Sequence, residues 1–353
     1  MLTLKYLVNI ICLLFIYLII ATNANIQASE EIRLLPNHHL ENGTFTNSNG
    51  VANNKKFKEL IKWSVEKKET KVVPINFEII KPNYSIINKN KDAYGITWIG
   101  HASFLYQNNE LNILTDPHLT ERASPLSFMG PKRYMRPAME LEELPKINIV
   151  TISHNHYDHL DLKTVKWIAK KNPDALFLVP LGLKKWFLNQ SIINVIELDW
   201  WDEYTKDNTT ITFTPVQHWS SRTLFDRNES LWGGWHIKNN HHSLIHLGDT
   251  GYSNDFKETN KRLGPVDLAL IPIGAYAPRW FMKFSHMNPS EAIQAFVDLE
   301  AKKAIGMHWG TFILTDEPVD EPPKVLKEEL KKRSISIDDF IVMKHGQTIN
   351  LDD

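Results

Sequence analysis

Three histidines and an aspartate fall within six residues of the segment Ser153-His154-Asn155-His156-Tyr157-Asp158-His159-Leu160-Asp161. An apolar run from Ile147 leads into this segment as a buried strand would, and a helical pattern follows it. His154 and His156 are two residues apart, so their imidazoles leave an extended chain on the same side. Asp158 and His159 stand where the chain turns into the helix and can face a second position nearby. Such ligands suit zinc, and paired metals in hydrolases lie ~3.5–4 Å apart, so the segment predicts a metal pair.

Three further residues of ligand type each stand just past a predicted strand: His218 after Thr210–Pro215, Asp249 after Ser243–Leu247 and His308 after Ala304–Met307. Taken alone, each is as well explained by a packing histidine or a turn aspartate. Their order after the dense cluster, each at a strand end, indicates one site assembled from several strand ends.

The rest of the chain predicts an α/β fold. From Gly95 onward, short β-branched runs are each stopped by Gly, Pro, Asp or His, as strands are. Hairpins come early in each half and βα units come later, which predicts two packed β-sheets flanked by helices. The remaining predicted strands are Gly95–Ile99, Phe104–Gln107, Leu111–Thr115, Ile147–Ser153, Leu176–Pro180, Val195–Leu198, Trp232–Ile237 and Leu268–Pro272, and the helices are Phe57–Lys67, Leu162–Lys171, Pro289–Glu300 and Lys324–Lys332.

The order of ligand-type residues resembles the metallo-β-lactamase superfamily. Longer strings resemble one family within it, the phospholipases D that hydrolyse N-acylphosphatidylethanolamine. They include Trp98-Ile99-Gly100-His101-Ala102, Met129-Gly130-Pro131-Lys132-Arg133, Gly248-Asp249-Thr250-Gly251-Tyr252, Ala275-Tyr276 through Phe284, His308-Trp309-Gly310-Thr311-Phe312 and Glu321-Pro322-Pro323. The resemblance covers residues 95 to 350 and implies a metallo-β-lactamase fold for that part of the chain.

The resemblance also implies roles for single residues. It implies two zinc ions per chain, one held by His154, His156 and His218, the other by Asp158, His159 and His308, with Asp249 bridging them. Asp158 and Asp249 would be the catalytic carboxylates. Tyr157 and His286 would contact the phospholipid, although each is also explained by packing or by a helix start.

Some residues near these motifs have two readings. His101 follows Gly100 in a tight connection between strands, and it is explained equally well as a partner of a metal ligand or as a packing residue. Asp116 and Asp161 are the next carboxylates that could take the bridging position.

The family resemblance implies hydrolysis of a phospholipid to a phosphatidic acid and an N-acylethanolamine. The same scaffold could serve a lactonase or a phosphodiesterase with a soluble substrate, because fold and metals do not set the substrate. A binding module without catalytic activity is disfavoured by the intact ligand set. The resemblance also makes a homodimer possible.

A phospholipid substrate requires contact with a membrane surface. Two strings interleave aromatic and basic residues, as an interface favours, although ordinary core with flanking charge explains them equally well. They are Phe128, Met129, Tyr134 and Met135 with Lys132, Arg133 and Arg136, and Trp280, Phe281, Met282 and Phe284 with Arg279 and Lys283.

The bulk composition sets outer bounds. The chain has 353 residues, 42% of them hydrophobic, and 40 basic residues balance 41 acidic ones. This balance excludes a nucleic-acid-binding protein, which needs a basic excess.

The first residues predict export. Lys5 precedes an apolar run from Tyr6 to Ala21, which is shorter than the ~20 residues of a comfortable bilayer span. Small residues follow, with cleavage expected after Ala24 or Ala28, and an uncleaved anchor is the alternative. The expected organisation is therefore a signal or anchor at 1–24, an extension at 25–93 and a hydrolase domain at 94–353.

Overall fold

The computed structural model describes residues 36–53, 57–66, 77–84, 94–108 and 111–352. The chain divides into two units, residues 1–39 and 40–353. The first unit is described at residues 36–39, which form a turn closed by the His39 N–H and the Pro36 carbonyl. The predicted signal or anchor at 1–24 and both cleavage positions lie outside the described residues. Among the described residues, no helix is long and apolar enough to cross a membrane.

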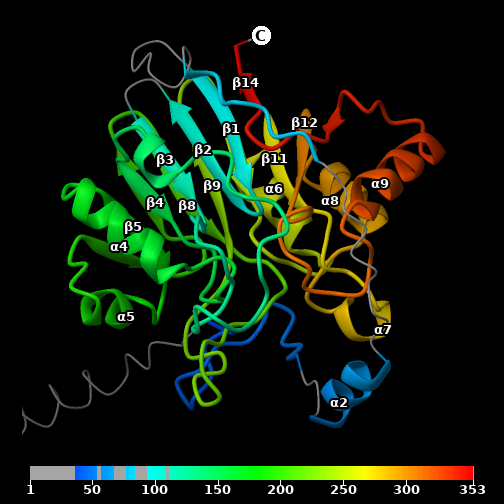
Figure 1. Cartoon of the computed structure of the whole chain (residues 1–353), viewed down its shortest axis with the longest axis horizontal. Coiled ribbons are helices and arrows are strands. Elements are labelled where there is room, and N and C mark those ends of the chain that lie inside the picture. Colours follow the sequence, from blue (N-terminus) through cyan, green and yellow to red (C-terminus); the bar gives the residue numbers. More distant parts are fainter. Residues whose placement is uncertain (1–35, 54–56, 67–76, 85–93, 109–110, 353) are drawn as a thin grey trace, which may run out of the picture. The chain divides into compact units, whose positions relative to one another are not determined.

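The larger unit contains two mixed sheets of seven strands each (Figure 1). The first has the order β14-β1-β2-β3-β4-β5-β6. Its strands from β3 to β6 are parallel, and its pairs β14–β1, β1–β2 and β2–β3 are antiparallel. The strands are β1 (Tyr94–Gly100), β2 (Ser103–Asn108), β3 (Leu111–Thr115), β4 (Ile149–Thr151), β5 (Leu176–Pro180), β6 (Val195–Leu198) and β14 (Thr348–Asn350).

The second sheet repeats this plan with the order β13-β12-β11-β10-β9-β8-β7. Its strands from β7 to β10 are antiparallel, and those from β10 to β13 are parallel. The strands are β7 (Glu203–Lys206), β8 (Thr209–Thr214), β9 (Gly234–Lys238), β10 (Ser243–His246), β11 (Leu268–Pro272), β12 (Lys303–Met307) and β13 (Phe340–Ile341). Hairpins early and βα units late are thus present in both sheets, which confirms the predicted fold.

The helices flank the two sheets, except for α2, which lies below α7 at the lower end of the view (Figure 1). They are α2 (Phe57–Glu66), the short 3-10 helix η1 (Leu141–Glu143), α4 (Leu162–Lys171), α5 (Lys184–Asn189), α6 (Asp255–Leu263), α7 (Arg279–Met282), α8 (Pro289–Asp298) and α9 (Glu321–Lys332). Asn288 caps α8 by accepting the Glu291 N–H, and Pro289 occupies the first turn, where a missing N–H costs nothing. Helix α9 begins earlier than predicted for the same reason, since its two prolines occupy its first turn.

Apolar side chains on alternate faces of the strands hold these layers together. Trp98, Phe213 and Trp235 lie between the two sheets in one buried cluster. On the other face of the first sheet, Val150 packs with Phe187 of α5 in a second cluster, which also takes in residues of α4. Burial of such side chains is the main contribution to folding, about 25 cal/mol per Å² of apolar surface.

Strand direction brings the predicted ligands to one edge. Strands β1, β3 and β4 run the same way in the first sheet, as do β8, β10 and β12 in the second. Their carboxyl ends therefore meet at a shared edge, where ligands commonly bind in sheets of this kind. Strand β4 is shorter than the predicted run Ile147–Ser153, since its last residues already turn toward this edge.

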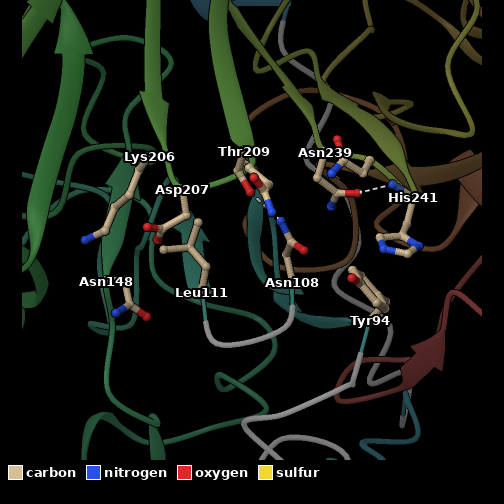
Figure 2. A pocket seen from close by; sticks show the side chains of 11 residues that line it. Tyr94, Asn108, Leu111, Asn148, Lys206, Asp207, Thr209, Asn239 and His241 are labelled. Atoms are coloured by element: carbon tan, nitrogen blue, oxygen red, sulfur yellow. Dashed lines mark hydrogen bonds between the residues drawn. The ribbon is translucent and has the colours of Figure 1, made fainter.

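A polar pocket of about 340 Å³ occupies the opposite edge (Figure 2). It lies at the β7–β8 and β9–β10 turns and at the amino ends of β1 and β3, and Tyr94, Asn108, Asn148 and Asn239 line it. Because the predicted ligands follow the carboxyl ends of the strands, this pocket is separate from them.

The extension before β1 belongs, from Leu40 onward, to the larger unit and contacts the rest of that unit at a specific point. Asn47 is buried, and its amide oxygen accepts the His218 backbone N–H and the Trp232 indole N–H, both at 3.0 Å. Its amide nitrogen donates to the carbonyls of Val51 and His218. The extension therefore fixes the backbone of a predicted metal ligand.

Replacing Asn47 by Ala should reduce the free energy of unfolding by roughly 1–3 kcal/mol, because buried donors lose their acceptor. Asn49→Ala is the matched control, since the two side-chain bonds of Asn49, to the Gln217 amide oxygen and from the Val51 N–H, are both exposed. Its effect should stay within about 0.5 kcal/mol. Denaturant titration of both variants measures the two changes in the free energy of unfolding. Equal changes would show that Asn47 does not stabilise the loop that carries His218.

Candidate metal centre

The predicted ligands come together at the carboxyl edge of the two sheets. Four of them follow β4 in a single loop, and the others follow β8, β10 and β12. The side chains that lie close enough to share ions are His154, His156, Asp158, His159, His218, Asp249 and His308, and the structure adds His101 and His286 to them.

His154, His156 and His218 form the first group. The Nε2 atoms of His154 and His218 lie 2.8 and 3.3 Å from Nδ1 of His156. The outer nitrogens of two of these rings are engaged elsewhere. His218 Nδ1 donates to the Ser285 carbonyl at 3.0 Å, and His154 Nδ1 contacts the Ser153 hydroxyl at 2.9 Å. Because the outer nitrogens of His154 and His218 have these partners, their Nε2 lone pairs face the same point as Nδ1 of His156. Histidines that bind a metal commonly have such a partner on the other ring nitrogen.

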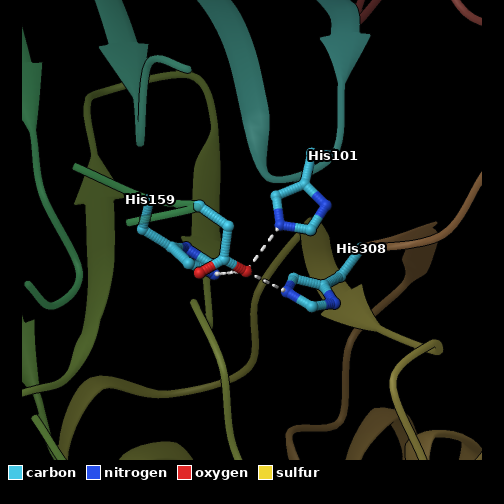
Figure 3. Close-up of side chains that lie close together, drawn as sticks. His101, His159 and His308 are labelled. Atoms are coloured by element: carbon cyan, nitrogen blue, oxygen red, sulfur yellow. Dashed lines mark hydrogen bonds and ion pairs between the residues drawn. The ribbon is translucent and has the colours of Figure 1, made fainter. Parts of the chain in front are cut away.

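The second group lies around the Asp158 carboxylate, which contacts the three histidines labelled in Figure 3. Asp158 Oδ2 lies 3.4 Å from His159 Nε2, 3.3 Å from His308 Nε2 and 3.0 Å from His101 Nε2. Behind this group, His159 Nδ1 lies 2.7 Å from Oδ2 of the buried Asp116. The same carboxylate accepts the Ser153 N–H and hydroxyl, so Asp116 orients both groups from outside.

Asp249 lies between the two groups. Its Oδ2 is 3.1 Å from His159 Nε2 and 3.9 Å from the Nε2 atoms of His154 and His218. Its Oδ1 is 3.0 Å from His308 Nε2. Asp249 thus contacts side chains of both groups, while Asp116 and Asp161, the alternatives from the sequence, bond to residues behind or beside the cluster.

The two groups differ in charge. Burial lowers the pKa of His154 and His218 well below the ordinary value and that of His156 to about 4, so these rings are neutral. Burial also opposes charge on His308, but Asp249 and Asp158 outweigh it and raise its pKa to about 9. The same carboxylates, with Asp116, raise the pKa of His159 well above its usual value against the effect of burial.

These side chains fit a metal. Four nitrogen or oxygen ligands around zinc at ~2.0–2.1 Å lie about 3.4 Å apart, and the contacts above span 2.8 to 3.9 Å. Asp249 Oδ1 and His159 Nε2 are buried, and although each lies 3.0–3.1 Å from a side-chain atom of the cluster, neither makes a well-formed hydrogen bond among the described residues. Buried polar groups rarely stay unsatisfied, so the arrangement is that of ligands sharing a cation.

An apolar pocket of about 610 Å³ opens beside the centre. Asp158, Asp249 and His156 line its polar end. The apolar side chains that line it are Trp63, Trp219, Phe281, Met282 and Leu314. The centre can therefore act on a polar group that carries a long apolar chain.

The two predicted substrate contacts both line this pocket. His286 lies with Nδ1 3.9 Å from Asp249 Oδ2. The Tyr157 hydroxyl donates to the Arg222 carbonyl at 3.0 Å, and the Arg222 guanidinium lies 4.1 Å from the Tyr157 ring centre. Tyr157 thus uses its hydroxyl proton to brace the loop after β8, which limits its part in binding a phosphate.

Several residues of the site were not predicted from the sequence. Arg222 donates to the carbonyls of Asn155 and Leu160 and so ties the ligand loop to the loop after β8. Trp63 of α2 stacks on Phe281 with ring centres 5.0 Å apart. Neither has a spacing signal, although the arginine lies four residues after His218.

Comparison with known proteins places the chain in a family. Residues 111–309 match the model of the Beta-lactamase superfamily domain. The N-acyl-phosphatidylethanolamine-hydrolyzing phospholipase D 1 of Caenorhabditis elegans is 44% identical over 263 residues, which cover 71% of this chain and 74% of that protein. The mitochondrial N-acyl-phosphatidylethanolamine-hydrolyzing phospholipase D of Saccharomyces cerevisiae is 40% identical over 65% of this chain, which spans half of the yeast protein.

Solved structures agree on the fold. A metallo hydrolase from the archaeon Ignicoccus hospitalis superposes with a TM-score of 0.56 at 22% identity, over 73% of this chain and 98% of that one. An isothiocyanate hydrolase from Delia radicum gut bacteria gives a TM-score of 0.59 at 18% identity, over 72% and 98% of the two chains. Fold, domain model and relatives together show that the chain belongs to the metallo-β-lactamase superfamily and, within it, to the family of the N-acyl-phosphatidylethanolamine-hydrolyzing phospholipases D.

Proposed function

We propose that this protein is a phosphodiesterase of phospholipase D type that uses two zinc ions to cleave N-acylphosphatidylethanolamine into N-acylethanolamine and phosphatidic acid. The observation that carries the proposal is the convergence of the two histidine groups on Asp249 at the polar end of an apolar pocket. The identity to two relatives with this named activity supports it.

The residues divide the work in a definite way. His154, His156 and His218 would hold one zinc ion, Asp158, His159 and His308 the other, and Asp249 both. Zinc bound in this way lowers the pKa of water toward about 7 and stabilises charge on phosphoryl oxygens. Asp158 would also orient the attacking water, since its carboxylate lines the polar end of the pocket together with Asp249.

The pocket supports an acylated substrate. Its lining is largely apolar away from the metal ligands, and it includes Trp63 and Phe281, which stack on each other. An amide-linked acyl chain would gain about 0.8 kcal/mol for each methylene that it buries there. A small polar diester would leave the same wall in contact with water.

Exposed apolar side chains near the site support membrane contact. Phe128 and Met129 are 76% and 59% exposed, and Trp280 is 48% exposed. Leu224 and Phe225, in the loop after β8, are about nine-tenths exposed. Of the two strings singled out in the sequence, Met135, Phe281 and Met282 are buried instead. The proposed docking surface therefore consists of Phe128, Met129, Leu224 and Phe225, which lie in loops, and Trp280, which lies in α7.

Export and self-association complete the proposal. The apolar run from Tyr6 to Ala21, with small residues after it, supports an exported or membrane-anchored protein. The family resemblance supports a homodimer.

Chelation should remove all activity, and freshly purified protein should contain about two zinc ions per chain, since the reaction depends on both groups of ligands. Elemental analysis and turnover of N-acylphosphatidylethanolamine in micelles measure this. Soluble lactones and diesters serve as comparison substrates. Full activity in chelator would contradict the metal mechanism, and preference for a soluble substrate would contradict the lipid assignment.

Asp249→Asn should abolish turnover and reduce zinc content, because it weakens both coordination spheres and removes a charge that offsets two dications. Tyr157→Phe should cost only about twofold to tenfold, since it removes one hydrogen bond worth ~0.5–1.5 kcal/mol. Zinc stoichiometry and phospholipid turnover are measured side by side. An Asp249→Asn protein with two zinc ions and more activity than Tyr157→Phe would rule out the bridge.

Phe225→Ser should weaken binding to phospholipid vesicles roughly 10- to 150-fold, because an apolar side chain that enters the bilayer contributes ~1.5–3 kcal/mol. Ile193→Ser is the matched control, since Ile193 is 81% exposed and precedes β6 at the opposite edge. Vesicle cosedimentation measures binding, and turnover of a short-chain soluble analogue should be equal in both variants. Equal vesicle binding by both would exclude the loop after β8 from the docking surface.

A further inference from the structure

His101 stands beside the proposed second metal group without belonging to the predicted ligand set. It forms the turn between β1 and β2, and its side chain is buried. Its φ of 55° lies in the left-handed region, which few residues other than glycine adopt. Strained residues persist where the surrounding structure fixes them.

Three hydrogen bonds hold this backbone conformation. The His101 N–H donates to the Thr311 hydroxyl at 2.8 Å. Its carbonyl accepts the Trp98 indole N–H at 3.0 Å and the His308 N–H at 3.1 Å. One of these bonds comes from a proposed metal ligand, so the β1–β2 turn and the ligand after β12 are positioned together.

The side chain has one polar contact among the described residues. His101 Nε2 lies 3.0 Å from Asp158 Oδ2, while Nδ1 is buried without a hydrogen-bond partner. An ionised carboxylate only accepts hydrogen bonds, so the imidazole proton must be on Nε2. The His308 ring centre lies 3.9 Å away and Phe312 meets the ring edge-on, so the imidazole is held in place.

This contact is compatible with two roles for His101, a further metal ligand or a hydrogen-bond donor to Asp158. The number of protein ligands at the second position distinguishes these roles. Asp158, His159, His308 and Asp249 already supply four protein ligands to the second position. Catalytic zinc sites keep a place for water beside three protein ligands and expand at most to five. A further imidazole would fill that place, whereas an N–H donated to Asp158 from outside leaves it open.

We propose that His101 is a positioning residue that donates a hydrogen bond to Asp158 and so orients this carboxylate toward the second metal. The inference rests on the two-metal part of the proposed function. Partners of this kind typically raise metal affinity 10–100-fold, and the first group, His154, His156 and His218, has no contact with His101.

The test measures metal affinity and not only turnover. Two variants distinguish the ability of the side chain at position 101 to reach Asp158 from the effect of the left-handed backbone at that position. His101→Asn tolerates the left-handed backbone but is too short to reach Asp158, and His101→Gln has the reach of Nε2 and can donate. His246→Gln is the control for loss of a buried imidazole, because His246 bonds to the Ala102 carbonyl and to no proposed ligand. Thermal unfolding of each metal-free protein checks folding.

Stepwise zinc affinities are measured by competition with a chelating dye. In His101→Asn the second zinc should bind 10–100-fold more weakly and the first should be unchanged. His101→Gln should restore most of the second affinity. Unchanged second affinity in His101→Asn would make His101 a packing residue, and loss in both variants as complete as in Asp158→Ala would make it a ligand. If the unaltered protein binds no zinc, the proposed function itself fails.

Discussion

The Asp249 carboxylate, buried among imidazoles, is the interaction on which the site depends. It lies within 3.9 Å of nitrogens from His154, His159, His218 and His308. A charged carboxylate away from water is costly unless it is paired. Burial raises its pKa, but His159, His308 and His286 outweigh that effect and hold it well below the ordinary value. The cluster therefore requires positive charge at its centre, which protons or metal ions can supply.

The fold meets this requirement by ending its strands in one place. Strands from both sheets run toward the same edge, so residues far apart in sequence meet around Asp249. A second layer then fixes the rings: Asp116 holds His159, the Ser285 carbonyl holds His218, and Asn47 holds the backbone of His218. Fixed tautomers and ring directions are what distinguish a metal centre from a loose histidine cluster.

The sequence predicted the two sheets and the side chains that the structure gathers at one edge, and it did so through local signals. Helix α4 and strand β6 begin and end at the predicted residues. Their bounds follow from local features, namely the spacing of apolar residues and the residues that stop an element. The short helices α5, α6 and α7 were not predicted, since each is too short for a clear period. Asn47, Arg222 and Trp63 were also missed, because long-range contacts give them their roles. The position of His101 against Asp158 likewise needed the strained β1–β2 turn, which no spacing reveals.

In the proposed mechanism the centre activates water for attack on phosphorus at the polar end of an acyl-binding pocket. Hydrolysis of N-acylphosphatidylethanolamine in water enriched in oxygen-18, followed by mass spectrometry of both products, tests this most directly. Attack of water on phosphorus predicts one heavy oxygen in the phosphatidic acid and none in the N-acylethanolamine, because the bond between phosphorus and the ethanolamine oxygen breaks. Label in the N-acylethanolamine, or release of products other than these two, would contradict it.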